Sequence, residues 1–333
     1  MSRIAWSLVA IFVYSSLWTN PVLAEPDRPV IVVPGILGSK LCERASGKVV
    51  WGTKWSLSNF SDLALPFNYD PTNLKHLSCG LIEGIDLLGP WQIHQYDDLL
   101  KTLAGLGYQN GKTLFVFDYD WRLSNRQSAR QLDEFIQKYV PSGKVDIIAH
   151  SMGGLIAKVW LAEFGGNSRI SWLVTLGTPF LGSASTFKTL DDGWGFWANL
   201  AAHGLGTVRE TAMTFPSLYE MLPAYARCCG FQSSGPQPTF FDPFALVNWQ
   251  RFKWLPARFT SADGQAWLGR TLADARAIAR LEIPPGTRVI TVVTGLIPTA
   301  WRVLFDPKDG HCSIMFPWRA TALSTKTAPP TTD

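Results

Sequence analysis

The chain has 333 residues, of which 47% are hydrophobic and 17% are charged, and its formal net charge at pH 7 is +4. This length predicts one large domain with insertions rather than a string of small domains. The net charge is small and no run of basic residues accompanies it, so the composition argues against a nucleic-acid partner.

The first residues have the features of an export signal. Arg3 supplies a positive start, residues 4–18 are an apolar run, and residues 22–24 (Val-Leu-Ala) form a small-residue cleavage site. The apolar run is shorter than the roughly 20 residues that a transmembrane helix needs. We therefore expect residues 1–24 to be a signal peptide and the mature protein to be exported, either to a periplasm or to the medium.

Strand patterns and helix patterns then alternate along the chain. Five short runs rich in β-branched residues are typical of strands that are buried on both faces of a parallel sheet. Between them, apolar residues recur at helical spacing, and Ser124 precedes one such helix as an N-cap. This alternation predicts an α/β fold with a mostly parallel, doubly wound sheet. In chain order, the expected strands cover residues 30–33, 114–117, 145–149, 172–176 and 289–293, and the expected helices centre on residues 96–103, 132–139, 155–161 and 268–279.

Two long segments lack this alternation. Residues 40–91 are polar and loop-like, and residues 183–266 are rich in glycine, proline and aromatic residues. Such segments inside a compact domain are usually lids or binding loops, so we expect a lid and a cap within a domain of residues 25–317. Two interpretations of the cap aromatics stay open: a satellite core, which is the usual fate of aromatic side chains, or the wall of an acyl-binding site. These aromatics include Trp194, Phe196, Trp197, Phe215, Trp249 and Trp254.

Cysteines can pair in the oxidising compartment that export implies. The chain has five, so at least one is unpaired within the chain. Cys42 and Cys79 bracket the loop-rich lid, and a bridge between them would clamp it. A bridge between the adjacent Cys228 and Cys229 would be strained, so the pairing of these two and of Cys312 stays open. No spacing predicts a zinc site, and we expect neither a metal nor a cofactor.

A serine lies at the junction between a predicted strand and a predicted helix. Residues 149–153 read Ala-His-Ser-Met-Gly. They resemble the Gly-x-Ser-x-Gly turn that presents a nucleophilic serine at the carboxyl edge of the sheet in α/β-hydrolases. Ala149 replaces the first glycine but keeps that flank small, while Gly153 and Gly154 let the helix approach the strand. We therefore expect an α/β-hydrolase in which Ser151 is the nucleophile.

An acyl-transfer reaction at this serine also needs hydrogen-bond donors for the developing oxyanion. One donor would be the backbone N–H of Met152, which follows the serine. The second would come from the turn after the first strand, where residues 34–38 read Pro-Gly-Ile-Leu-Gly. The sequence leaves open whether Ile36 or Leu37 supplies that second N–H.

The histidine base is harder to assign. In this fold the catalytic residues follow in the order Ser, Asp or Glu, His. His150 adjoins the serine, and we expect its side chain to point away from the hydroxyl. His311 is a weak candidate, with Asp306 or Asp309 as its carboxylate. Three further histidines precede any expected acid; these are His76, His94 and His203.

Taken together, these segments resemble the lecithin:cholesterol acyltransferase family, which includes a lysosomal phospholipase A2 and phospholipid:diacylglycerol acyltransferases. The resemblance covers about residues 29–309. Its most specific parts are the Pro-Gly-Ile-Leu-Gly turn and the Asp-Tyr-Asp-Trp-Arg block. The matching segments are residues 32–41, residues 49–51 with Cys42 and Cys79, residues 118–122, 149–154 and 176–183, and, more loosely, residues 295–307.

The resemblance implies an activity, a partner and a disulfide. The activity would be that of a serine-dependent O-acyltransferase or lipase, which acts on phospholipid or other lipid esters through an acyl-serine intermediate. The partner would be a lipid substrate, with contact to a membrane or lipoprotein surface. Cys42 and Cys79 would form the family's lid disulfide.

The end of the chain departs from the family pattern. The family's catalytic acid lies in a Gly-Asp-Gly-Thr-Val motif with a histidine after it, and neither appears here. Restoring one C after the Pro317 codon lets the same bases spell Leu-Ala-Gly-Asp-Gly-Thr-Val. We therefore expect a one-base deletion to have scrambled residues 318–333, which resequencing across this point tests. Two alternatives stay open: a catalytically dead lipid-binding or misfolded fragment, and a generic esterase that uses the His311 pair.

Overall fold

The computed structural model describes residues 26–53, 56–82, 84–86, 92–94, 96–192, 205–233, 238–251, 255–293, 299–308 and 310–316. The expected signal peptide of residues 1–24 and the expected scrambled tail of residues 318–333 lie outside these ranges. None of the helices within these ranges combines the length and the apolar character that a membrane span requires.

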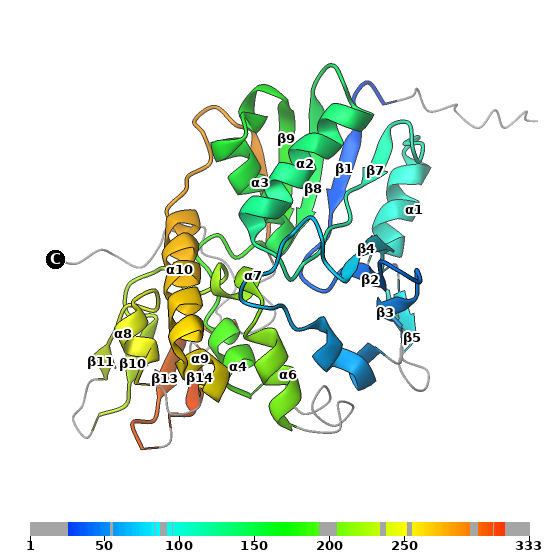
Figure 1. The fold of residues 1–333 in the computed structure, drawn as a ribbon. Coiled ribbons are helices and arrows are strands. Elements are labelled where there is room, and N and C mark those ends of the chain that lie inside the picture. The colour runs from blue at the N-terminus through cyan, green and yellow to red at the C-terminus, as the bar shows by residue number, and fades with distance from the viewer. Residues whose placement is uncertain are drawn as a thin grey trace, which may run out of the picture.

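A five-stranded parallel sheet forms the centre of the fold (Figure 1). Its strand order, β12-β9-β8-β1-β7, confirms the predicted parallel sheet and its five strands. The direction of winding reverses between β1 and β8, so the carboxyl ends of these two strands flank a topological switch point, where ligands bind in open α/β sheets. The strands span Val30–Val33 (β1), Leu114–Val116 (β7), Val145–His150 (β8), Ile170–Leu176 (β9) and Val289–Val292 (β12).

Helices pack on both faces of this sheet because successive side chains of a strand point to opposite faces. On the face that includes Val32, the helix α1 (Asp97–Gly105) buries its apolar side. On the face that includes Val33, α2 (Asn125–Tyr139) and α3 (Met152–Glu163) form the main core. As predicted, Ser124 caps α2: its hydroxyl oxygen accepts a hydrogen bond from the N–H of Arg126. A short 3-10 turn, Gly166–Ser168, leads from α3 to β9.

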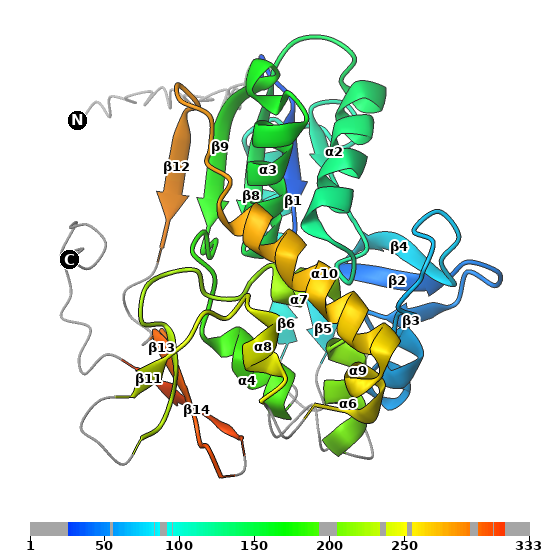
Figure 2. The same cartoon turned by 60° about the vertical axis from the view of Figure 1, so that its left-hand side comes forward.

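A cap lies beneath the carboxyl edge of the central sheet in both views (Figures 1 and 2). It extends beyond the expected residues 183–266, because two strands from residues 302–315 complete its four-stranded sheet, β11-β10-β13-β14. The cap strands are Cys229–Phe231 (β10), Thr239–Phe240 (β11), Arg302–Phe305 (β13) and Cys312–Met315 (β14). The surrounding helices are Ser185–Asp192 (α4), Leu205–Ala212 (α6), Pro216–Tyr219 (α7), Leu246–Trp249 (α8), Ala257–Thr260 (α9) and Ala262–Ala279 (α10).

The described aromatic residues of the cap pack mainly against one another. Phe187 lies with its ring centroid 5.6 Å from that of Trp249 and 5.2 Å from that of Phe305. These three rings and that of Phe215 are fully buried. This favours the core interpretation for them. Four of the aromatics named from the sequence lie outside the described residues: Trp194, Phe196, Trp197 and Trp254.

The lid segment, residues 40–91, is more regular than its polar composition predicts. It holds a three-stranded antiparallel sheet, β3-β2-β4, and the β5–β6 hairpin. These strands form through backbone hydrogen bonds, although their sequence does not alternate apolar and polar residues. The expected disulfide between Cys42 and Cys79 is confirmed, whereas Cys228, Cys229 and Cys312 are buried thiols. The elements are Ser39–Glu43 (β2), Val49–Trp51 (β3), Ser56–Leu63 (a 3-10 helix), His76–Leu81 (β4), Gly84–Asp86 (β5) and Gln92–His94 (β6).

Candidate active site

Ser151 occupies a strained turn between β8 and α3. Its backbone has φ 50° and ψ −121°, a combination that residues with a side chain rarely adopt. The N–H of Ser151 donates to the carbonyl of Leu176 at 2.8 Å, which holds the turn against the next strand. The side chain is half-buried, and its hydroxyl makes no hydrogen bond within the described part of the chain. Strand, strained serine and helix together form the geometry of a nucleophile elbow.

Glycines bring this turn against the end of β1. A Cβ atom added to Gly35 would lie 2.9 Å from the Cβ of Ser151. One added to Gly153 would lie 2.6 Å from the carbonyl oxygens of both Val33 and Pro34. Real Cβ atoms do not approach so closely, so a side chain at either position would push the two strand ends apart. The two glycines therefore place Ser151 at the topological switch point.

The turn after β1 presents backbone N–H groups beside the elbow. The N–H of Gly38 donates to the carbonyl of Gly35 at 3.1 Å, so Ile36 and Leu37 are the central residues of a β-turn. Leu37 has a φ of 65°, which this turn type normally reserves for glycine. Met152 begins α3, where the first N–H groups lack an intrahelical acceptor. Within the described residues, neither Ile36 nor Met152 donates its N–H to another protein atom.

A buried tyrosine ties the two sides of the site together. The N–H of Gly35 donates to the hydroxyl oxygen of Tyr96 at 2.8 Å, and this hydroxyl lies 2.8 Å from Nδ1 of His150. Burial raises the pKa of Tyr96 to about 12 and lowers the pKa of His150, so the hydroxyl keeps its proton and the imidazole is neutral. The two neutral groups therefore share a hydrogen bond, and the tautomer of His150 decides which of them donates. That His150 faces away from the nucleophile stays a prediction: a Cβ atom added to Gly35 would lie 3.0 Å from Nδ1 of His150 and 2.9 Å from the Cβ of Ser151.

Three further side chains hold the turn after β1 through its carbonyl oxygens. The hydroxyl of Tyr119 donates to the carbonyl of Pro34 at 2.8 Å. The indole N–H of Trp51 donates to the carbonyl of Leu37 at 3.0 Å. The indole N–H of Trp121 donates to the carbonyl of Ser39 at 3.1 Å, just beyond the turn. Aromatic residues of the lid and of the segment after β7 thus fix the position of the candidate oxyanion donors.

The Asp-Tyr-Asp-Trp-Arg block also links that segment to the lid. Arg122 and Asp120 form a buried two-point ion pair, with N–O distances of 2.9 and 2.6 Å. A third N–H of the Arg122 guanidinium donates to the carbonyl of Leu63 at 2.9 Å. Removal of either partner would leave a charge buried without its counter-ion, which is strongly destabilising. The block is therefore a clamp between the lid and the catalytic edge.

The carboxylate that pairs with His311 is Asp191, not Asp306. Nδ1 of His311 lies 3.1 Å from Oδ1 of Asp191, and Oδ2 of this buried carboxylate accepts the N–H of Cys312 at 2.9 Å. Asp306 accepts the N–H of Lys308 in the turn between β13 and β14. Sequence reasoning missed Asp191 because 120 residues separate it from His311. The pair fastens α4 to β14, and no hydrogen bond among the described residues joins it to Ser151.

The other histidines and carboxylates named from the sequence fall into two groups. His76 is buried in β4, where burial lowers its pKa and the carbonyl oxygen of His76 lies 3.5 Å from the guanidinium of Arg122. His203, Asp309 and the side chain of His94 lie outside the described residues.

A family comparison covers most of this framework. The sequence model described as "Lecithin:cholesterol acyltransferase" matches residues 71–255, more than half of the 333-residue chain. This chain belongs to the lecithin:cholesterol acyltransferase family. The match includes the Asp-Tyr-Asp-Trp-Arg block and the nucleophile elbow, and it ends before β12.

Curated members of the lecithin:cholesterol acyltransferase family align with long parts of the chain. "Lecithin-cholesterol acyltransferase-like 4" of Arabidopsis thaliana is 29% identical over 251 residues, which cover 64% of this chain and 45% of that protein. "Phospholipase A(1) LCAT3" of the same plant is 31% identical over 158 residues, 41% of this chain and 35% of that protein. "Phosphatidylcholine-sterol acyltransferase" of Rattus norvegicus is 27% identical over 213 residues, 51% and 48% of the two chains. The chain thus spans less than half the length of these three relatives.

A solved structure supports the fold alone. A chain of the Tle4–Tli4 complex superposes with a TM-score of 0.51 at 15% sequence identity, covering 84% of this chain and 77% of that chain. With the parallel sheet and the elbow, this confirms the predicted α/β-hydrolase architecture of this family member.

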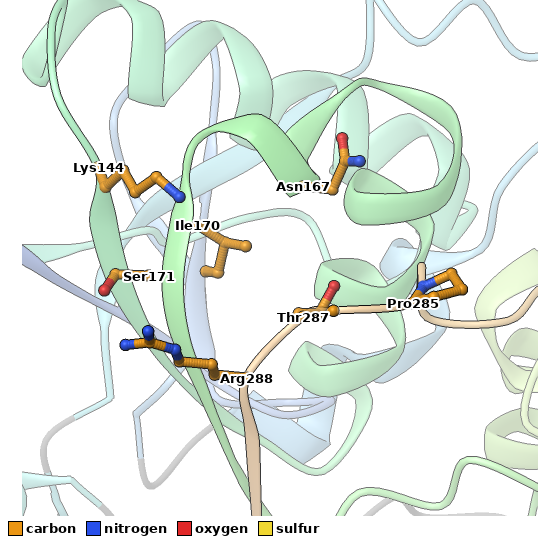
Figure 3. Close-up of a pocket in the computed structure, with 8 residues that line it drawn as sticks. Lys144, Asn167, Ile170, Ser171, Pro285, Thr287 and Arg288 are labelled. Atoms are coloured by element: carbon orange, nitrogen blue, oxygen red, sulfur yellow. The ribbon is translucent and has the colours of Figure 1, made fainter.

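A polar pocket lies at the opposite edge of the sheet from Ser151. Its volume is about 400 Å³, and it opens between the strand beginnings, with Lys144 and Arg288 on one side and Asn167 and Thr287 on the other (Figure 3). Because Ser151 sits at the carboxyl edge, this pocket is not part of the candidate active site. In the described ranges, no three His, Cys, Asp or Glu side chains are grouped to hold a metal ion.

Proposed function

We propose that this member of the lecithin:cholesterol acyltransferase family is a serine-dependent O-acyltransferase or lipase that acts on phospholipid or other lipid esters. The observation that carries the proposal is the strained Ser151 at the switch point, beside the uncommitted N–H groups of Ile36 and Met152. The hydroxyl of this strained serine has no hydrogen-bond partner in the described part of the chain. It is therefore available to react with an external electrophile.

The proposed reaction has two steps. In the first, Oγ of Ser151 attacks the acyl carbonyl, its proton passes through water to the departing alcohol oxygen, and the N–H groups of Ile36 and Met152 bind the oxyanion. The ester C–O bond then breaks, the alcohol leaves with a proton, and an acyl-serine remains. In the second step, another alcohol or water attacks this acyl group and releases a new ester or a fatty acid together with the free serine.

The proposed substrate class rests on the relatives. Those named above carry descriptions of acyltransferases for lecithin or phosphatidylcholine and of a phospholipase A(1). Because the chain covers less than half of each, we extend only the shared chemistry, which is attack on an acyl ester of a lipid.

We also propose that the protein works outside the cytoplasm. The Cys42–Cys79 disulfide supports this location, since disulfides persist in oxidising compartments and are rare in the cytosol. The export signal expected in residues 1–24 points to a periplasm or to the medium.

Turnover of two substrates tests the proposed function. Release of fatty acid from phosphatidylcholine vesicles and from a soluble p-nitrophenyl ester is compared for the wild type, Ser151→Ala and Ser171→Ala. Ser171 is the matched control because it lies at the beginning of β9, at the amino edge. We expect Ser151→Ala to remove at least about a thousandfold of the activity on both substrates, since an acyl-serine cannot form. Full activity of Ser151→Ala would overturn the proposal.

A further inference from the structure

The small sheet of the cap presents an outer face that the proposed chemistry does not use. The pairing of β13 with β14 places Arg302 opposite Met315. The neighbouring residues Val303, Phe305 and Cys312 are buried toward the cap core. Because side chains alternate along a strand, Arg302 and Met315 project to the outer face. That face is exposed in the described structure.

Aromatic rings hold the arginine of this face. The guanidinium carbon of Arg302 lies 3.9 Å from the ring centroid of Trp301 and 5.0 Å from that of Phe240. A second arginine, Arg227, lies 6.0 Å from the same Phe240 ring. A hydrogen bond of 2.9 Å from Nε of Arg302 to the carbonyl of Arg227 joins the two. Both guanidinium groups thus lie against the ring of Phe240, and the side chain of Arg302 is held by the backbone of Arg227.

Within the ranges that the structure describes, no carboxylate forms an ion pair with either Arg227 or Arg302. Burial and the positive charge of the neighbouring Arg227 lower the pKa of Arg302. Arg227 also has a φ of 57°, a strained conformation for a residue with a side chain. The fold therefore maintains two close positive charges at a cost, and an external anion would relieve the repulsion.

Large apolar side chains are exposed next to Arg302 in the chain and in the sheet: Trp301 precedes it, Met315 pairs opposite it, and Phe316 follows Met315. Trp301, Met315 and Phe316 are 39%, 38% and 53% exposed. The hydroxyl of Tyr225 donates to the carbonyl of Trp301 at 2.7 Å, so the backbone that carries the exposed indole is held in place. Protein surfaces that bind at the boundary between lipid headgroups and acyl chains typically combine exposed Trp and Phe side chains with arginines.

We propose that an Arg–Trp patch on the cap, formed by Arg227, Phe240, Trp301, Arg302, Met315 and Phe316, docks the protein on an anionic phospholipid surface. The choice of a lipid surface rests on the proposed function, whereas the need for an anion rests on the unpaired arginines. The guanidinium groups bind lipid phosphates, and Trp301 and Phe316 enter the layer beneath them. The cap that covers the catalytic edge would then be the part that meets the bilayer (Figures 1 and 2).

Vesicle binding by the full chain tests the docking surface. Co-sedimentation is measured with vesicles of phosphatidylglycerol and phosphatidylcholine, and with vesicles of phosphatidylcholine alone. The test variant is Arg227→Gln/Arg302→Gln. The matched control is Arg270→Gln/Arg280→Gln, which removes the same charge from two exposed arginines, one on α10 and one directly after its last residue. We expect the test variant to lose at least about tenfold in partitioning onto the anionic vesicles and the control to lose less than about twofold.

A second variant and a soluble polyanion sharpen the result. Trp301→Gln should weaken binding to both kinds of vesicle, because it removes the inserted side chain rather than a charge. Equal losses in the two arginine pairs would overturn the proposal, since net charge alone would then explain binding. An equal loss of binding to heparin would also overturn it, because the patch would then be a general polyanion surface.

The outcome is separable from that of the proposed function. Ser151→Ala should bind vesicles as the wild type does. Patch-dependent binding by a chain that hydrolyses no ester would leave the docking surface standing and remove the proposed function. If the chain hydrolyses esters but Arg227→Gln/Arg302→Gln and Trp301→Gln bind vesicles as the wild type does, the proposed function stands and the docking surface is removed.

Discussion

At the scale of single residues, the site depends on groups that hold Ser151 and the oxyanion turn rather than on the serine alone. Tyr96 accepts the N–H of Gly35 and shares a hydrogen bond with Nδ1 of His150, so one hydroxyl holds the ends of both β1 and β8. The sequence predicted Tyr96 only as a helix residue, since nothing local links it to a histidine 54 residues away.

Tyr96→Phe should lower turnover with little effect on substrate binding. The ring stays, but the Gly35 N–H loses its acceptor and the turn that carries the Ile36 N–H loosens. We expect about a tenfold fall in kcat with KM nearly unchanged, since one buried hydrogen bond contributes roughly 1–1.5 kcal/mol. Steady-state kinetics on a p-nitrophenyl ester measure this. Tyr139→Phe, at an exposed tyrosine of α2, is the control; equal kinetics in the two variants would refute a positioning role for Tyr96.

Glu220 should make stability depend on pH. Burial raises its pKa to about 7, and the hydrogen bonds from Ser124 and Asn125, at 2.6 Å each, offset this only in part. The folded state therefore holds a proton that the unfolded chain, with an ordinary pKa near 4.5, releases. The stabilising contribution is complete below about pH 4.5 and is lost as pH rises to about 7, a change of roughly 3 kcal/mol.

Glu220→Gln removes this titration and keeps an oxygen for the Asn125 N–H. Relative to the wild type, the variant should gain stability as pH rises from 4.5 to 7. Thermal melts across this range measure the difference in Tm between the two proteins. A difference that stays constant with pH would show that the pKa of Glu220 is not raised.

At the scale of elements, the lid is joined to the hydrolase core at a few defined points. The disulfide connects β2 to β4 and closes a loop with a sequence separation of 37 residues. In the chain-entropy description, a cross-link of this span contributes roughly 3–4 kcal/mol by restricting the unfolded chain.

Cys42→Ser/Cys79→Ser should therefore unfold at lower urea concentration than the wild type. The loss should be roughly 3–4 kcal/mol, or less if the bridge is strained. The same loss should follow when the wild type is reduced before unfolding, which separates the bridge from the effect of serine. A wild type whose urea midpoint is unchanged by reduction would contradict the structural role of the bridge.

Local sequence patterns predicted the strands and helices that carry an apolar pattern of their own. The other elements form only through pairing with residues far away in the sequence. The run of residues 30–33 was recognisable because a strand buried on both faces has to be apolar throughout, whereas residues 145–149 include Asp146 and alternate in burial. Strand β10 has only three residues, and it exists because it pairs with β13, more than 70 positions later. The elbow was readable because its residues are contiguous. Asp191 and Tyr96 were not, since their partners are brought to them only by the tertiary fold.

At the scale of the whole molecule, the central sheet has an open edge at β12. In the described residues, only β9 pairs with β12, and Val292 and Val293 are 49% and 72% exposed. An exposed apolar strand of this kind is a template for pairing with another chain.

Val292→Lys should reduce self-association. A charge on the open strand discourages pairing between edges and costs little, because the side chain is already half in water. The monomer fraction is measured by size-exclusion chromatography with light scattering. Val247→Lys, at a 62% exposed position on α8, is the control for added charge. Equal effects of the two substitutions would assign the association to net charge rather than to the edge of β12.

The central claim is that Ser151 is the nucleophile of this acyltransferase-family chain, and covalent labelling tests it most directly. The protein is treated with a fluorophosphonate, digested with trypsin and analysed by mass spectrometry. Cleavage after Lys144 and Lys158 gives a peptide of residues 145–158 that contains Ser151 as its one serine. The account predicts the phosphonyl adduct on Ser151 and none in Ser151→Ala. An adduct that persists in the alanine variant, or one found on another serine of the wild type, would contradict it.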